Sequence, residues 1–334
     1  MKRKLLYVFV LIFEMFMFKN AKATEALHSG TCGNDCLWTW DTSGTLNITG
    51  EGDMISHPWT NIEGYQTDVT NIVIQGKITD GNGHIVSTGI TSVPDSAFYW
   101  MQGVQHISIG DSVTTIGDSA FRSMWNVEGS LVIPNSVVNI GKYAFLDMEK
   151  VNGELVIPST VTSIEDGAFW GLHGITSLTI PDSVTSIGTK AFFKVDGLTD
   201  LTIPDSVSTI GEYAFAKRDN DTGAPTINDS ITNLTIGANT LSKYLEAMGG
   251  FTQTGDINIH CTTGNCQAIL EAWDAANGTT YASRAKTIVT NSDGSKTVYD
   301  LSGNLIGYKG KRIYTIDEAN QVAGEKNRVS IKYR

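Results

Sequence analysis

Residues 178–192 read LTIPDSVTSIGTKAF, and residues 201–215 read LTIPDSVSTIGEYAF, in the same register 23 residues further on. The Ala-Phe pair that closes each stretch recurs along the chain, with phenylalanines at 98, 121, 145, 169, 192 and 215. A fixed period of roughly 20–30 residues is typical of a solenoid, in which each turn contacts only its neighbours. The phrase therefore predicts the fold before it says anything about function.

The copy at 201–215 suggests a role for each part of one turn. Residues 201–203 (Leu-Thr-Ile) alternate as in a half-buried strand, and Pro204 ends that strand because it lacks an N–H. Residues 205–206 (Asp-Ser) fit a turn in which short polar side chains bond their own backbone. Gly211 is expected to permit a bend at positive φ. Residues 214–215 (Ala-Phe) form a corner, and we expect the phenylalanines to stack in a column along the axis.

Stacked turns make each strand one rung of a parallel sheet, with rungs ~4.8 Å apart. The predicted rungs are 72–74, 107–109, 131–133, 155–157, 178–180, 201–203 and 234–236. A polar stretch at 217–229 interrupts the repeat and is expected to bulge out as a loop.

Residues 24–68 predict an N-terminal β cap over the open end of the core. They hold Trp38, Trp40 and Trp59 around an alternating apolar and polar stretch. The repeat itself is expected to extend over residues 69–240.

A second cap is expected at 241–285, with a last degenerate rung at 257–259 and a helix over 267–276. Residues 286–334 lie outside the repeat and predict a small basic β-meander module. This module is expected to close with a short helix, capped at 317–320, and a final strand at 328–333.

The repeat phrase resembles the BspA-like leucine-rich repeats, also called the Treponema pallidum type, whose pattern is I-P-x-S-V-x-x-I-G-x-x-A-F. Copies run over 133–145, 157–169, 180–192 and 203–215, with poorer copies at 90–98 and 109–121. The departures are modest: Glu165 replaces the bend glycine, and Gly110 and Gly237 replace the proline that ends the strand. The resemblance implies a leucine-rich-repeat-like solenoid of 23–24-residue repeats, mainly β with short helical turns. It also implies a bacterial surface or secreted protein, since the best-known members bind host matrix proteins and other bacteria.

Residues 1–23 have the layout of a secretory signal peptide. A basic start at 2–4 precedes an apolar run at 5–18 and a small-residue cleavage site at 21–23. The run is short for a membrane span, and an uncleaved anchor is the alternative. No later stretch of the sequence is apolar enough to cross a bilayer. We expect an exported chain that is secreted, periplasmic or held at the cell surface.

Charge is unevenly distributed along the expected mature chain. Residues 24–285 carry 10 basic and 29 acidic side chains, whereas residues 286–334 carry 9 basic and 5 acidic ones. An acidic body is a poor partner for nucleic acid. The basic tail could dock on the acidic body or on an external partner, or simply be solvated.

Four cysteines form two tight pairs, Cys32 with Cys36 and Cys261 with Cys266. Four cysteines could hold zinc, but an exported chain favours disulfides. The pairs fall at opposite ends of the expected rod, so a single four-cysteine zinc site does not fit. We predict two local disulfides.

No catalytic motif occurs in the sequence, and we expect no catalytic residue, metal or cofactor. The histidines, at 28, 57, 84, 106, 173 and 260, show no ligand spacing. Polar residues that follow the rungs could attract calcium as a ladder, although local turn capping is the expected role. They are Asp111, Asn135, Asp182 and Asp205. The loop at 219–223 resembles a calcium loop but lacks the later ligands.

The candidate binding residues follow the Ala-Phe pairs and should line up at one corner of the solenoid. They are Tyr99, Trp100, Arg122, Trp125, Leu146, Trp170 and Phe193. Exposed aromatic side chains in a contiguous patch favour binding, and the alternative is that they cover the core beneath the corner. The outward strand residues Ser108, Val132, Val156, Thr179, Thr202 and Thr235 suggest at most a shallow, low-affinity face.

Three functional hypotheses follow. The first is a binding or adhesion module for a protein or glycan partner, such as host matrix or a cell surface. The second is a structural component of the envelope that docks through its basic tail. The third, more remote, is a glycosidase, which would need two carboxylates about 5–9 Å apart in an aromatic cleft. Ligand identity and oligomeric state stay open at this point.

Overall fold

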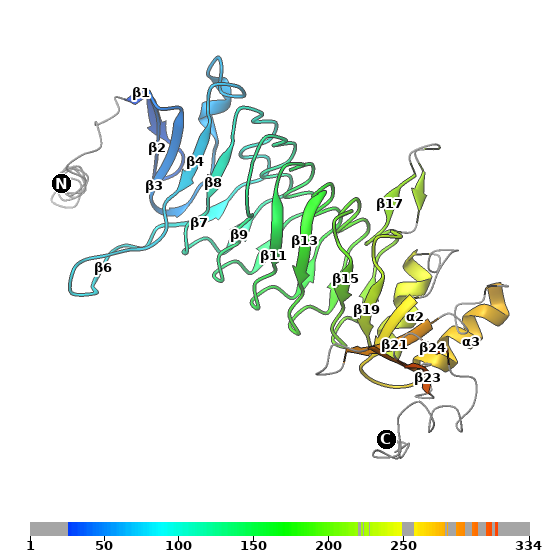
Figure 1. Cartoon of the computed structure of the whole chain (residues 1–334). Coiled ribbons are helices and arrows are strands. Elements are labelled where there is room, and N and C mark those ends of the chain that lie inside the picture. The colour runs from blue at the N-terminus through cyan, green and yellow to red at the C-terminus, as the bar shows by residue number, and fades with distance from the viewer. Residues whose placement is uncertain are drawn as a thin grey trace.

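The computed structural model describes residues 26–219, 222, 224–226, 228–248, 257–277, 279, 285–290, 296–299, 305–308 and 311–312. They form an elongated rod in which the chain winds from an N-terminal β cap to two helices at the far end (Figure 1). Parallel strands of successive turns pair along the rod, which confirms the predicted repeat solenoid. The predicted signal peptide and the predicted elements at 317–333 lie outside the described residues.

The N-terminal cap is an antiparallel meander of β1 (Ala26–Thr31), β2 (Asp35–Asp41) and β3 (Thr45–Asp53). A short 3-10 helix, η1 (Pro58–Asn61), follows and buries Trp59. β3 then pairs in parallel with both β4 (Asn71–Ile74) and β7 (Ile90–Val93). One cap strand therefore starts both sheet faces of the solenoid.

The long-strand face carries the predicted rungs. It consists of β4, β8 (His106–Ser108), β11 (Asn152–Val156), β13 (Gly174–Thr179), β15 (Asp200–Thr202) and β19 (Asn233–Ile236). The short-strand face consists of β7, β9 (Thr115–Ile116), β10 (Asn139–Ile140), β12 (Ser163–Ile164), β14 (Ser186–Ile187) and β16 (Thr209–Ile210). Most turns thus contribute one strand to each face, with an apolar interior between them.

One predicted rung, at 131–133, does not form a strand. Its leucine and isoleucine are still buried, but the backbone keeps only an isolated bridge between Gly129 and Val151 among the described residues. Repeats of 24 residues carry one residue more between the phenylalanine and the rung, and Gly129 and Gly153 take φ of 81° and 84° there. At the second of these positions the register of β11 on β13 shifts between Gly153 and Glu154, as at a β-bulge, whereas at the first the rung does not form a strand.

Two hairpins project from the rod (Figure 1). The first joins β5 (Ile78–Thr79) to β6 (Ile85–Ser87), between the first two rungs, and the sequence analysis missed it. The second joins β17 (Lys217–Arg218) to β18 (Pro225–Thr226). The polar insertion at 217–229 therefore projects as predicted, although it starts as a hairpin rather than an irregular loop.

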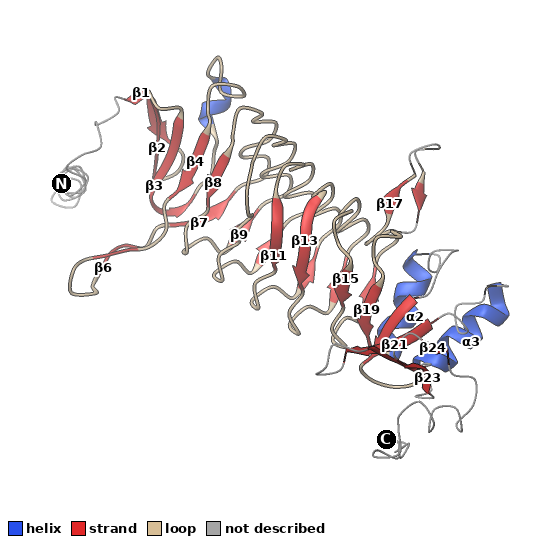
Figure 2. Cartoon of the chain, in the orientation of Figure 1, coloured by secondary structure: helices blue, strands red, loops and turns tan. Residues whose placement is uncertain are grey.

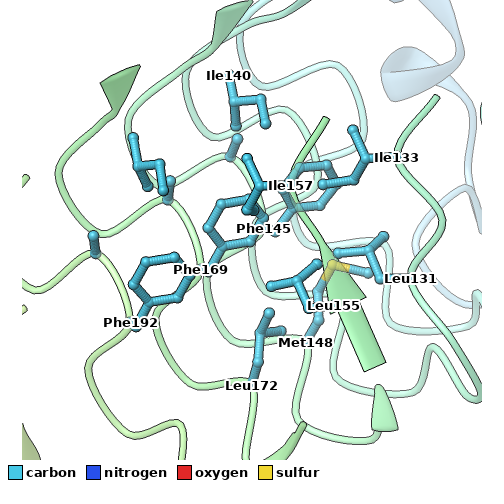
Figure 3. Close-up of a cluster of buried hydrophobic side chains, with 14 of the residues drawn as sticks. Leu131, Ile133, Ile140, Phe145, Met148, Leu155, Ile157, Phe169, Leu172 and Phe192 are labelled. Atoms are coloured by element: carbon cyan, nitrogen blue, oxygen red, sulfur yellow. The ribbon is translucent and has the colours of Figure 1, made fainter. Parts of the chain in front are cut away.

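The core is organised around a column of stacked rings, as predicted. Successive phenylalanines from Phe98 to Phe215 lie 5.2–5.6 Å apart between ring centroids, with nearly parallel planes. Trp59 extends the column at the N-terminal end, 5.3 Å from Phe98, and Tyr244 extends it at the other end, 6.2 Å from Phe215. Figure 3 shows the central rings among the leucines and isoleucines of the two faces. Each turn thus buries its ring against two neighbours.

The C-terminal cap contains a helix that the sequence analysis did not predict, α2 (Ala238–Met248). It lies across the end of the core (Figure 2) and takes the place of a further turn. Thr240 donates to the Val207 carbonyl at 3.1 Å, and the Tyr213 N–H donates to the Ala247 carbonyl at 3.0 Å. These two hydrogen bonds pair a carbonyl and an N–H of the last turn, and the Tyr244 ring covers the last phenylalanine of the column, Phe215.

Beyond α2 the predictions for this end agree with the structure. The degenerate rung is β20 (Ile257–Cys261), and the predicted helix is α3 (Cys266–Asn277). β21 (Ala285–Thr290) pairs in parallel with β20, and a meander of β22 (Lys296–Tyr299), β23 (Leu305–Tyr308) and β24 (Lys311–Arg312) follows. The described part of the basic tail therefore continues the long-strand face. Both predicted disulfides, Cys32–Cys36 and Cys261–Cys266, are present.

Two positions of the repeat phrase act differently from the prediction. Ser206 does not bond its own turn; its hydroxyl donates to the Val184 carbonyl of the preceding turn at 2.8 Å. Gly211 does not have positive φ, and its role is close approach, since a Cβ there would lie 2.3 Å from the Thr189 nitrogen. Both residues therefore make their contacts with the preceding turn and not within their own.

Candidate functional site

The corner of each turn has a regular backbone that sets the direction of its side chains. From Phe98 to Phe192, the residues two before and two after each phenylalanine are left-handed. For Phe145 these are Tyr143 and Asp147, with φ of 58° and 60°. The amides of the corner donate to carbonyls of the next turn, as Phe145 does to Ala168 at 2.9 Å. Since this pattern repeats, side chains at equivalent positions form columns along the rod.

The predicted binding residues fall into two groups. Leu146 and Phe193 are 5% and 4% exposed and cover the core, so they offer little accessible surface. Trp100 is 39% exposed, and Tyr99, Arg122, Trp125 and Trp170 are half-buried. The sequence analysis missed two residues at this corner, Tyr143 and Lys190. The name corner surface is used below for seven residues: Tyr99, Trp100, Arg122, Trp125, Tyr143, Trp170 and Lys190.

Arg122 is held between two tyrosine rings. Its guanidinium carbon lies 5.6 Å from the Tyr99 ring centroid and 5.9 Å from that of Tyr143. The three residues come from three successive turns, so the rings clamp the cation from both sides along the rod. The Arg122 Nε is buried and has no hydrogen-bond partner in the described part of the chain. The cation is thus stabilised by the aromatic faces, which attract positive charge.

Two tryptophans flank this clamp. Trp100 lies 5.7 Å from Trp125 and meets the Tyr99 ring edge-on at the same 5.7 Å. Trp100 has φ of 63°, an uncommon conformation for a bulky residue, and its amide donates to the Arg122 carbonyl at 2.9 Å. The large, partly exposed ring of Trp100 thus lies between Trp125 and Tyr99, and Tyr99 in turn contacts the Arg122 guanidinium.

A second cation–aromatic group lies further along the rod. The Lys190 Nζ is 5.3 Å from the Trp170 ring centroid and 5.8 Å from that of Phe193. Between the two groups, Gly167 leaves room for the Tyr143 ring: a Cβ there would lie 2.4 Å from Tyr143 Cδ1 and 3.6 Å from Trp170 Cε3. Aromatic surface therefore continues from Arg122 to Lys190.

Two acids near the corner surface, Asp166 and Asp147, differ in their surroundings. Asp166 pairs with Lys142 at 3.0 Å and accepts the Thr189 N–H at 2.9 Å, and the Lys142 hydrogen bond lowers the pKa of Asp166. Burial raises the pKa of Asp147, more than the positive charges of Lys194 and Arg122 lower it. Asp147 is thus attracted by both cations, but among the described residues it forms no ion pair with either.

Two of the polar residues that follow the rungs, Asp111 and Asp205, accept hydrogen bonds from other turns of the protein. Asp111 accepts the Lys77 N–H at 2.8 Å, and Asp205 accepts the Thr262 hydroxyl at 2.8 Å. Across the described residues, no group of three or more His, Cys, Asp or Glu side chains is placed to hold a metal ion. Nor does any helix described here have the length and apolar character needed to span a membrane.

The long-strand face exposes small side chains and some valine. Val132 is 72% exposed, Val156 46% and Val73 38%. The predicted outward residues from Ser108 to Thr235 carry neither a ring nor a charge, in contrast to the corner surface.

Comparison with known proteins agrees with the repeat architecture. The model of the BspA type leucine rich repeat region matches residues 82–169 and 128–245, in six copies. No curated protein sequence matches the chain.

The chain is also similar to several solved structures. A leucine rich cell surface protein from Faecalibacterium prausnitzii A2-165 is 22% identical, with a TM-score of 0.38 over 63% of this chain and 55% of its own. A leucine-rich repeat protein from Bacteroides ovatus ATCC 8483 is 18% identical, with a TM-score of 0.45 over 74% of this chain and 69% of its own. The T. pallidum leucine rich repeat protein is 16% identical, with a TM-score of 0.24 over 50% of this chain and 88% of its own. The chain spans about half the length of the first of these.

Proposed function

Because this chain belongs to the BspA-type leucine-rich repeat proteins, we propose that it is an exported protein-binding module whose contact surface is the corner surface. Binding, rather than catalysis, is its proposed role. The observation that carries this proposal is the continuous set of contacts from Trp125 through Trp100 and Tyr99 to Arg122, which Tyr143 also contacts.

The composition of the corner surface supports a protein partner. Trp, Tyr and Arg are the residues most enriched at the energetic centres of protein interfaces. Their rings lose little conformational entropy on binding because their rotamers are already restricted by their neighbours. The ladder of backbone hydrogen bonds behind them, such as Trp100 to Arg122 at 2.9 Å, holds the surface in one shape before a partner arrives.

A peptide-display selection on the immobilised chain tests the proposal. Trp100→Ser and Trp125→Ser should each weaken the selected binders by roughly thirtyfold, the effect of removing about 2 kcal/mol at an interface centre. Val132→Ser, on the long-strand face, is the matched control and should leave binding unchanged, since that residue is 72% exposed and away from the corner.

Two results would overturn this assignment. Selected binders that are indifferent to both tryptophan substitutions but lost on Val132→Ser would move the site to the long-strand face. Binding to a glycan array that depends on Trp100, with no peptide enriched, would replace the protein partner by a carbohydrate.

Export is the second part of the proposal. Its support is the sequence of residues 1–23, with a basic start, an apolar run and a small-residue cleavage site. Expression of the full chain in a bacterial host should give material outside the cytoplasm whose first residue is Thr24. Material that keeps Met1 and stays in the cytoplasm would contradict export.

A further inference from the structure

Two cations of the corner surface have no acidic partner in the described residues. Lys142, Lys150 and Lys243 each lie within 3.7 Å of a carboxylate oxygen, and Lys217 pairs with Asp229. Arg122 and Lys190 instead lie over aromatic rings. Lys77 and Lys194 also form no ion pair among the described residues, so what distinguishes Arg122 and Lys190 is that each lies near two aromatic rings.

Both cations are held in fixed positions. Rings on two sides restrict the Arg122 guanidinium, and its planar fork can bind both oxygens of a carboxylate. Lys190 lies over Trp170, and its amide donates to the Glu212 carbonyl at 3.0 Å. A rigid cation loses less entropy when it binds an anion than a solvated lysine does.

The distance between the cations matches an extended peptide. Arg122 follows Phe121 and Lys190 precedes Phe192, three turns further along the rod. Three rungs correspond to about 15 Å, and an extended chain rises about 3.3 Å per residue, so roughly four or five residues cover the distance. The rings of Tyr143 and Trp170, on either side of Gly167, provide an apolar floor between the two cations.

We propose that the corner surface binds an extended acidic segment of a protein partner that runs along the rod. One carboxylate of the segment binds Arg122, and a second carboxylate, four or five residues away, binds Lys190. This inference rests on the proposed function and adds the chemistry and spacing of the partner. The acids of the corner do not compete strongly, since Asp166 is paired with Lys142 and the Asp147 carboxyl is half-buried.

Synthetic peptides of twelve residues test the spacing directly. Two glutamates are placed two, five or nine residues apart in a Ser/Thr background, and fluorescence anisotropy measures binding to the mature chain. The peptide with a spacing of five should bind at least tenfold more tightly than the other two. Its affinity should fall as salt rises from low to physiological ionic strength, because the charges are partly exposed.

Variants of the protein identify the two anchors. Arg122→Gln and Lys190→Gln should each reduce the affinity of the peptide with a spacing of five to that of a peptide with a single glutamate. Lys150→Gln is the matched control, because Lys150 is an exposed lysine already paired with Glu128, and it should have no effect. Thermal unfolding curves that coincide with the wild type show that each variant is folded.

Three results would overturn the inference: equal binding at all spacings, equal binding when the glutamates are replaced by lysines, or no effect of Arg122→Gln. Binding of heparin that depends on Arg122, with no binding of any peptide, would also overturn it. If display-selected binders depend on Trp100 but lack acidic residues, the proposed function stands and this inference fails. If they depend on neither Trp100 nor Arg122, both fail.

Discussion

Phe169→Ala removes one ring from the middle of the column. Phe169 is fully buried and stacked between Phe145 at 5.6 Å and Phe192 at 5.4 Å. Neighbouring turns contact each other but not more distant ones, so this single substitution weakens the two interfaces that join the N-terminal and C-terminal halves of the rod.

The expected loss is about 3–5 kcal/mol, the usual cost of removing a fully buried phenylalanine and leaving a cavity. The upper part of that range is favoured here, since each stacked pair adds about 0.5–1.5 kcal/mol to the burial of its area. A globular domain is stable by about 5–15 kcal/mol in total. The variant should therefore fold, but its halves should no longer unfold as one unit.

Urea unfolding followed by two probes measures this separation. The tryptophans at 38, 40, 59, 100 and 125 all precede Phe169, so fluorescence reports mainly on the N-terminal half, whereas far-UV circular dichroism reports on the whole chain. The two transitions should coincide in the wild type and separate in Phe169→Ala. Val156→Ala, an outward residue that is 46% exposed, is the control and should change stability by less than about 0.5 kcal/mol. A loss below about 1 kcal/mol with coincident transitions would refute the role given to the ring column.

Three further predictions concern contacts between turns. Ser183→Ala should cost about 0.5–1.5 kcal/mol in urea unfolding, because it removes the 2.7 Å hydrogen bond to a partly buried carbonyl of the preceding turn, whereas Asp182→Ala nearby should cost less than about 0.5 kcal/mol. Gly211→Ala should cost about 1–3 kcal/mol by overpacking, and an unchanged midpoint would show that the backbone of the preceding turn can move away. The pKa of Asp166 is lowered by Lys142, so its contribution is present above the unfolded pKa of about 3.9 and is lost as pH falls through the lower folded value. Asp166→Asn should therefore unfold at a lower temperature than the wild type at pH 7 and at nearly the same temperature at pH 2; a difference that persists at pH 2 would contradict this.

The period of the phenylalanines was enough to predict the fold, because one ring per turn is all that the column requires. From the sequence we predicted that Ser206 would bond within its own turn and that Gly211 would bend its own turn at positive φ, and both predictions were wrong. Their partners are Val184 and Thr189, which lie in the preceding turn. A linear pattern shows which residues repeat but not which neighbour each one contacts.

The helix α2 was missed for a different reason. Leu241, Tyr244, Leu245 and Met248 have the spacing of a helix face, but the stretch follows directly on the last strong rung and was included in an undivided cap. The interruption at 131–133 had a signal too, since the spacing of the phenylalanines changes from 23 to 24 there.

The candidate site was predicted in part. Register alone placed Trp100, Arg122 and Trp125 at one corner, but the exposure of each depends on the size of its neighbours in adjacent turns. Phe193 is buried because Trp170 and Lys190 cover it. Tyr143 was missed because it precedes its phenylalanine, whereas the predicted residues follow theirs. Its left-handed backbone, which accompanies the contact with Arg122, cannot be predicted from a tyrosine at that position.

Because of the way α2 closes the rod, the number of repeats can change without altering either end. The helix presents a ring, a hydroxyl and a carbonyl to the last turn, the same three groups that any further turn would present. Gain or loss of a whole 23-residue unit in the gene would leave both ends chemically unchanged. Such an event between Arg122 and Lys190 would lengthen or shorten their separation by one rung, about 4.8 Å, and so alter which partners fit while the protein still folds. Recombination within the repeats is thus a simple route from one binding specificity to another.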